Sequence, residues 1–264
     1  MRLSKSDLML PVTALLATLL LAAKSTSHET RHGHAAAAAA ARRPGPAKSP
    51  CPSEMEFVQG RYCVDRYEAS TVEVRADGTT EPHSPYVAVT GIRVRAVSRK
   101  GVVPQAYISR NQAEGACREA GKRLCSDKEW ISACKGPTGT RFPYGNERRD
   151  DYCVDTNRTA PLNKLFGGLG RARYFSKPMN DPRLNQQMGT VAPTGSFANC
   201  TNGFHVYDMV GNVHEWTADP KGTFRGGYYL DTHINGDGCD YRTVAHEPTY
   251  HDYSTGFRCC SDSK

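Results

Sequence analysis

The placement of the cysteines constrains this chain more than any other feature of its sequence. All ten lie between residues 51 and 260. An even number of cysteines in an exported chain predicts disulfide bonds. Their spacing does not repeat the C-x-x-C pairs that structural zinc sites use. The sequence therefore predicts a disulfide-bonded domain built on Cys51, Cys63, Cys117, Cys125, Cys134, Cys153, Cys200, Cys239, Cys259 and Cys260.

The first residues indicate export. Arg2 and Lys5 precede an apolar run from Leu8 to Ala23, and small residues at the end of this run suit cleavage. This layout is typical of a secretory signal peptide, so residues 1–23 are predicted to be removed and the protein to be secreted or periplasmic. The run is shorter than the roughly 20 apolar residues of a membrane span. An uncleaved N-terminal anchor is the alternative, and after cleavage we expect no membrane span.

Residues 24–50 are predicted to form a disordered linker rich in Ala, Pro and His, because they contain few large apolar side chains to bury. The domain then spans residues 51–264. Its charge is nearly balanced: residues 1–50 hold seven of the 34 basic and two of the 27 acidic residues, which leaves 27 and 25. A nucleic-acid-binding domain would carry a strong basic excess. We therefore expect no nucleic acid partner.

Short strands dominate the first part of the domain. Residues 51–68 alternate in a way that predicts a hairpin, and a bond between Cys51 and Cys63 could join its two arms. Residues 71–104 continue as Val-rich segments interrupted by Gly and Pro, which favours strands and loops. We expect Trp130 and Trp216 to be core residues, since tryptophan buries a large area.

Two helices are predicted in the middle of the domain. Asn111 and Glu114 suit a capping box at the start of the first, and Ser126 and Glu129 suit one at the start of the second. Each helix is expected to end at a glycine, Gly121 and Gly136 respectively. Two helices among short strands and long loops indicate an α+β fold.

Four stretches of sequence resemble, in the expected order, the signature blocks of a known family. They are AGKRLCSDKEW with the later FPYG (120–130 and 142–145), GFHVYDMVGNVHEWT (203–217), FRGGY (224–228) and GFRC (256–259). On these blocks the chain resembles the formylglycine-generating-enzyme, or sulfatase-modifying factor, family. The resemblance implies a variant of the C-type-lectin fold with few helices, short strands and much irregular loop.

The second block resembles a calcium site of this family. By residue matching, Asp208 and Glu215 would supply side chains, and Gly211 and Val213 would supply carbonyl oxygens. Carboxylates and carbonyls are the ligands that calcium prefers. The alternative is that Asp208 and the neighbouring Asn212 only satisfy backbone groups of the turn. A second calcium site of the family would fall near Asn157.

The resemblance also implies a copper site, because family oxidases make formylglycine from a substrate cysteine with copper and oxygen. Two thiols hold Cu(I), which suits the softness of this ion. Asp231 stands where the first thiol would be, and Cys239 is a near match to the second. Tyr228 stands where the family has a serine. An aspartate cannot replace a thiolate for Cu(I), so the departure argues against oxidase activity.

The resemblance implies one long-range disulfide, between Cys117 and Cys259. It also pairs Cys134 with a cysteine at the position of Thr243, which leaves Cys134 without its usual partner. Cys239 is then either that partner or a reactive thiol. Nine helical residues separate Cys134 from Cys125, about 13 Å against the roughly 5.5 Å that a disulfide allows. The sequence leaves the partners of Cys125, Cys153, Cys200 and Cys260 open.

These observations leave three hypotheses about function. The first is a diverged binding module, stabilised by calcium and disulfides, for a protein, peptide or glycan outside the cytoplasm. The second is a copper oxidase that acts on sulfatase-type cysteine peptides and uses Cys239 with another thiol. The third is a different metal oxidase that uses Asp231 with His233 or His246. Loop histidines without a metal, including His251, are the alternative to the third.

Overall fold

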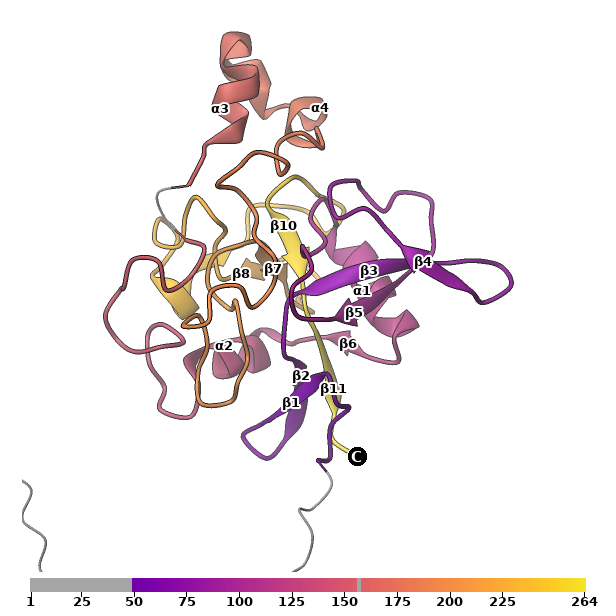
Figure 1. Cartoon of the computed structure of the whole chain (residues 1–264), viewed down its shortest axis with the longest axis vertical. Coiled ribbons are helices and arrows are strands. Elements are labelled where there is room, and N and C mark those ends of the chain that lie inside the picture. Colours follow the sequence, from indigo (N-terminus) through magenta and orange to yellow (C-terminus); the bar gives the residue numbers. More distant parts are fainter. Residues whose placement is uncertain (1–48, 156–157) are drawn as a thin grey trace, which may run out of the picture. The chain divides into compact units, whose positions relative to one another are not determined.

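The computed structural model describes residues 49–155 and 158–264 (Figure 1). The predicted signal peptide, the predicted linker and Asn157 lie outside the described residues, apart from the linker's last two. No helix within the described ranges is long and apolar enough to cross a membrane. The architecture is the α+β type that the sequence predicted, with short strands, few helices and long loops.

The first sheet joins the two ends of the domain. Its four strands follow the order β1 (Met55–Val58), β2 (Tyr62–Asp65), β11 (Cys259–Asp262) and β6 (Arg123–Leu124). The predicted hairpin is thus β1 and β2, and it turns at Gln59 and Gly60, which both have positive φ. Two such residues form the turn that matches the twist of paired strands.

Two further sheets complete the strand structure. One has three antiparallel strands in the order β4 (Thr80–Pro82), β3 (Ala69–Val74) and β5 (Val94–Ser98). The other has the order β10 (Thr255–Phe257), β7 (His214–Trp216), β8 (Phe224–Arg225) and β9 (Arg242–Thr243). β7 pairs with β10 in parallel on one side and with β8 antiparallel on the other, so it is an inner strand of this sheet, and it is buried along its length.

The first predicted helix begins earlier than expected. In α1 (Arg110–Glu119) the N-cap is Ser109, whose hydroxyl accepts from the Gln112 amide while the Gln112 side chain accepts from the Ser109 amide. The expected capping box of Asn111 and Glu114 is therefore wrong. The Glu114 carboxylate instead pairs with Arg110 one turn back, an arrangement that the sequence pattern alone does not distinguish from a cap.

The second helix begins and ends as predicted, and an unpredicted helical segment follows it. α2 (Asp127–Lys135) has Ser126 and Glu129 in a reciprocal capping box and Gly136 at its end. Further along lie α3 (Pro161–Phe166), a 3₁₀ segment η1 (Gly167–Tyr174) and α4 (Ser176–Met179), and then a single turn η2 (Gly238–Asp240). None of these has a side-chain cap, and they are too short to show helical periodicity.

All ten cysteines are paired, in five disulfides. The two bonds anticipated above, Cys51–Cys63 and Cys117–Cys259, are both present. The other three are Cys125–Cys260, Cys134–Cys239 and Cys153–Cys200. Successive side chains of a strand point to opposite faces, so β11 uses adjacent cysteines to fasten α1 on one side and the start of α2 on the other.

The two tryptophans lie in separate cores, as expected of core residues. Trp130 on α2 packs in a cluster that also holds the Cys134–Cys239 and Cys153–Cys200 bonds. Trp216 on β7 packs against α1 and the neighbouring strands. Their indole nitrogens are both satisfied, by Glu215 at 2.6 Å and by the Ile108 carbonyl at 2.9 Å.

We predict that replacing Cys153 and Cys200 together by serine destabilises the domain more than replacing Cys51 and Cys63. The first bond joins residues 47 positions apart and the second joins residues 12 apart. By chain entropy alone the two losses differ by about 1 kcal/mol in free energy of unfolding. Urea denaturation of both double variants measures the difference. Equal losses, or a larger loss for the hairpin pair, would contradict this account.

Candidate functional site

The turn that precedes β7 has an unusual backbone. Asp208, Gly211 and Asn212 all adopt positive φ, at 58°, 83° and 56°. A side chain at Gly211 would meet the Val154 carbonyl oxygen at 2.2 Å, so only glycine fits there. Aspartate and asparagine tolerate this conformation better than other side chains. The sequence DMVGN therefore fixes a tight turn directly in front of the central strand.

Asn212 holds this turn in place. Its side-chain amide exchanges hydrogen bonds with the backbone of Ala192, at 2.8 and 3.1 Å, and donates to Glu68 at 2.6 Å. Glu68 also accepts from the Val213 amide at 3.2 Å. Asn212 thus satisfies the backbone of a neighbouring loop and not that of its own turn.

Three buried carboxylates gather around one guanidinium group. Glu215 receives Arg258 at 2.7 Å on each of its oxygens and also accepts from Trp130. Glu68 and Asp208 are also buried and lie within electrostatic reach of Glu215 and Arg258. When all three carboxylates are ionised, Arg258 leaves two negative charges uncompensated.

The two acids that Arg258 does not bond directly, Asp208 and Glu68, have raised pKa values. Burial raises the pKa of Asp208 to about 7, and the nearby charge of Glu215 acts in the same direction, although the Gly195 amide donates to Asp208 at 2.6 Å. Burial, together with the charges of Asp208 and Glu215, raises the pKa of Glu68 well above its usual value. The cluster therefore favours binding of either protons or a cation.

The expected calcium ligands differ in their availability. Glu215 has both oxygens engaged by Arg258 and Trp130, whereas among the described residues the Asp208 side chain accepts a hydrogen bond only from the Gly195 amide. The carbonyl oxygens of Gly211 and Val213 accept no hydrogen bond from the described residues. Within 49–155 and 158–264, no three His, Cys, Asp or Glu side chains converge as a ready-made metal site. The donors that fit a hard cation are thus Asp208 and the turn carbonyls.

Asp231 has a structural task. It lies in a tight turn closed by reciprocal backbone hydrogen bonds with Tyr228 at 2.9 Å. One carboxylate oxygen accepts from the amides of His233 and Ile234, both at 3.0 Å, and the other accepts from the Tyr241 hydroxyl at 3.0 Å. Both oxygens of the carboxylate at the expected thiol position therefore already accept hydrogen bonds from its own loop.

Cys239 is not a reactive thiol. It forms a disulfide with Cys134 and is fully buried, so the interpretation of Cys239 as a catalytic sulfur is wrong. The physical reason is that α2 and η2 lie against each other and bring the two sulfurs together. Cys134 thereby obtains the partner that Thr243 does not provide.

The predicted loop histidines do not share one site. His246 stacks on Tyr250 with ring centres 3.9 Å apart, and His251 bonds Asn180 at 2.7 Å. His233 is exposed and lies 3.3 Å from an Asp231 carboxylate oxygen, so of the predicted pairs the structure brings only these two together within the described residues. His214, which no sequence motif singled out, is buried on β7 between aromatic rings. The feature of the sequence that could have indicated its burial is its place beside Glu215 and Trp216 in the second signature block.

His214 is neutral in this environment. Burial lowers its pKa to about 3, and its Nδ1 has no hydrogen-bond partner among the described residues. The rings of Phe224, Tyr228 and Tyr241 lie 4.4 to 5.5 Å away. Tyr228, where the resemblance implies a serine, thus belongs to an aromatic cluster beside Asp231.

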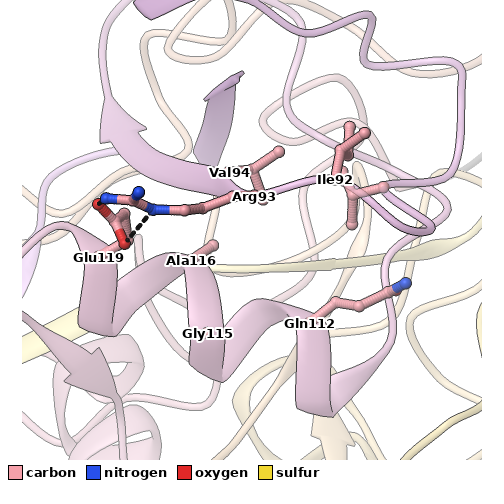
Figure 2. A pocket seen from close by; sticks show the side chains of 8 residues that line it. Ile92, Arg93, Val94, Gln112, Gly115, Ala116 and Glu119 are labelled. Carbon is pink, nitrogen blue, oxygen red and sulfur yellow. Dashed lines mark hydrogen bonds and ion pairs between the residues drawn. The ribbon is translucent and has the colours of Figure 1, made fainter. Parts of the chain in front are cut away.

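Two of the pockets on other parts of the domain lie near β5. The larger of these two, of about 550 Å³, is bordered by β3, β4 and β5 and by the loops that follow β4 and β5. The smaller, of about 190 Å³, lies between β5 and α1, where Arg93 and Glu119 form an ion pair at 2.7 Å beside Val94 and Ala116 (Figure 2). Neither is lined by a residue of the predicted metal sites.

Comparison with known proteins identifies the relatives of this chain. The model of the sulfatase-modifying factor enzyme 1-like domain matches residues 53–263. The formylglycine-generating enzyme of Mus musculus is 29% identical over 184 residues, which cover 60% of this chain and 44% of that protein. That of Thermomonospora curvata is 29% identical over 219 residues, which cover 69% and 65%.

A protein of Bos taurus named inactive C-alpha-formylglycine-generating enzyme 2 is 30% identical over 172 residues, which cover 60% of this chain and 50% of that protein. The chain therefore spans about half to two thirds of the length of these relatives. Among solved structures, the Major Tropism Determinant I1 variant matches 81% of this chain and 54% of its own, at 14% identity and a TM-score of 0.44.

We predict that Asp208 makes the domain lose stability as the pH rises. The pKa of this acid is about 7 in the folded state, above its ordinary value of 3.8. Folding therefore favours the protonated acid, and the stability that this gives the domain is fully present below about pH 4 and is lost as the pH rises through 7. Without divalent cations, Asp208→Asn should therefore gain on the order of 2–4 kcal/mol in free energy of unfolding relative to wild type between pH 4 and pH 8. Urea denaturation across this range measures the effect. Parallel pH profiles for the two proteins would refute it.

Proposed function

We propose that this chain, which belongs to the sulfatase-modifying factor enzyme 1-like family, acts as a binding protein and not as a formylglycine-generating oxidase. The observation that carries the proposal is the absence of any free thiol, because all ten cysteines are paired. A Cu(I) site of the kind implied by the resemblance needs two thiolates. Asp231 occupies the first position, and the sulfur of Cys239 is committed to Cys134.

The neighbourhood of Asp231 supports this view. Its carboxylate accepts three hydrogen bonds from its own loop, so a metal ion would have to displace them. Tyr228 and His214 pack on each other beside this loop, with ring centres 4.9 Å apart. The relatives include both formylglycine-generating enzymes and a protein named inactive, so the family accommodates either outcome.

The proposed ligand is a protein, peptide or glycan outside the cytoplasm. Five disulfides fit an oxidising compartment, and the predicted signal peptide directs the chain to be secreted or periplasmic. Long loops on a disulfide-bonded scaffold suit recognition, since loops tolerate variation while the scaffold stays rigid. The larger pocket, beside β3, is one surface where such a ligand could dock.

Calcium is proposed as a stabilising ion at the turn before β7. Asp208 and the carbonyl oxygens of Gly211 and Val213 are the donors that fit it, and the two uncompensated negative charges around Arg258 favour a divalent cation. Bound calcium would supply charge compensation only. Its expected effect is to keep Asp208 ionised at neutral pH and so to remove the loss of stability described above.

The first test asks whether the chain lacks the thiols, the Cu(I) site and the oxidase activity of a formylglycine-generating enzyme, as the proposal requires. Thiol titration of the unreduced protein in denaturant should find no reactive group, and Cu(I) should not bind with the affinity of a two-thiolate site. A sulfatase-type cysteine peptide should remain unmodified by mass spectrometry, while the Thermomonospora curvata enzyme converts it under the same conditions. Aldehyde formation by this chain would overturn the proposal.

The calcium proposal has its own test. Isothermal titration of the chelator-treated protein at pH 7 should show one tight calcium site that Asp208→Ala removes. The exposed Asp237→Ala serves as the matched control and should bind as wild type does. Binding should also release protons, since it lowers the pKa of Asp208. Absence of calcium binding by wild type, or unchanged binding by Asp208→Ala, would exclude the site.

A further inference from the structure

One short segment of the domain carries a net positive charge and projects from the rest. Residues 161–188, which we name the cationic segment, contain five basic residues and Asp181 as their only acid. The domain from residue 51 holds 27 basic and 25 acidic residues, so the remainder has 22 and 24. A segment of net charge +4 is thus attached to a body of net charge −2.

The cationic segment folds largely on itself. Its elements α3, η1 and α4 contact one another, and Figure 1 shows them projecting from the domain at the end opposite the β1–β2 hairpin. Its two ends are built into the domain: Leu162 and Leu184 are buried, the Met179 carbonyl accepts from the Tyr253 amide at 3.1 Å, and Asn180 donates to the His251 carbonyl at 3.1 Å. Residues 167–177, which we call its outer part, make no hydrogen bond to the described residues outside the cationic segment.

The outer part combines exposed apolar side chains with unpaired cations. Leu169, Tyr174 and Phe175 are 51%, 56% and 68% exposed. Within the described residues only Arg183 of the segment's cations forms an ion pair, with Asp181. The other four make none, and they are Lys164, Arg171, Arg173 and Lys177.

Exposed leucine and aromatic residues among lysines and arginines are typical of segments that bind the interface of an anionic membrane. The cations are attracted to lipid phosphates, and the apolar side chains enter the boundary between headgroups and acyl chains. A projecting tip suits this use. A stable protein interface would need about 800 Å² of complementary surface on each side, which favours a flatter region.

We infer that the cationic segment docks the domain onto the surface of an anionic phospholipid bilayer, with Leu169, Tyr174 and Phe175 inserted at headgroup depth. This surface is separate from the turn before β7 and from the Asp231 loop. The inference does not depend on the proposed binding function, and either can fail without the other. A partner protein with an acidic surface is the competing occupant.

A local reporter is needed, because the predicted linker also carries basic residues and would attract the same vesicles. Trp130 and Trp216 are buried, so a new exposed tryptophan dominates any change in emission. We expect the emission of Phe175→Trp to shift to the blue on vesicles of equal phosphatidylglycerol and phosphatidylcholine, and to be quenched by brominated acyl chains. Ile234→Trp, at a site 74% exposed outside the segment, is the matched control and should not respond.

Charge variants test the electrostatic part. Neutralising the four unpaired cations to glutamine should weaken binding of the Phe175→Trp protein to these vesicles on the order of 10²- to 10³-fold, since each cation near an anionic surface contributes about 1 kcal/mol. The matched control neutralises four exposed cations elsewhere and should cost less than about tenfold; these are Arg99, Lys100, Lys128 and Lys221. Vesicles of phosphatidylcholine alone should not measurably bind the Phe175→Trp protein or either of its four-charge variants.

Three results would overturn the inference. One is an unchanged emission of the Phe175→Trp protein on anionic vesicles, and another is an equal response of the Ile234→Trp control. The third is an equal loss of binding for the two four-charge variants, which would indicate attraction of the whole chain. If polyglutamate but not vesicles shifted the emission of the Phe175→Trp protein, the partner would instead be an acidic protein.

Discussion

The buried ion pair between Arg258 and Glu215 is the interaction on which the rest of the domain depends. Neither side chain is accessible to water, and the guanidinium group also donates to the carbonyls of Asp65 and Tyr207 at 3.0 and 2.8 Å. Trp130 completes the set from α2. One arginine thus ties β2, the loop before β7, the strand β7 itself and the C-terminal strands together. Removing one partner would leave the other charged and buried, which is far more costly than losing a surface pair.

Local signals in the sequence predicted the elements that local interactions determine. The hairpin at Cys51–Cys63 and the second helix with its Ser126–Glu129 box follow from neighbours a few residues apart. The start of the first helix did not, because Ser109–Gln112 and Asn111–Glu114 are both acceptable capping boxes and only tertiary contacts choose between them. The helical elements from Pro161 onward gave no periodic signal, since α3 and α4 are shorter than two turns and η1 is interrupted at Gly170.

The candidate site was predictable only as far as single residues were matched to motifs. Asp208 and Glu215 are three-dimensional neighbours, as the motif implied, yet their roles differ because Arg258 arrives from 43 residues further along the chain. Glu68, at the opposite end of the domain sequence, joins the same cluster without any signature of its own. Such pairings depend on long-range topology, and neither periodicity nor composition contains that information.

In this family member a structural disulfide uses the sulfur of Cys239, which the resemblance matches to a copper-binding thiol. By the resemblance, Cys134 would bond a cysteine at position 243, and a separate thiol near Cys239 would remain free for copper. Here position 243 is threonine, so a buried Cys134 would lack a partner unless Cys239 supplied one. The disulfide that results links α2 to η2 and commits the sulfur of Cys239 to the scaffold. At position 231 the carboxylate is likewise part of the scaffold, because it accepts from the Tyr241 hydroxyl and from two amides of its own loop.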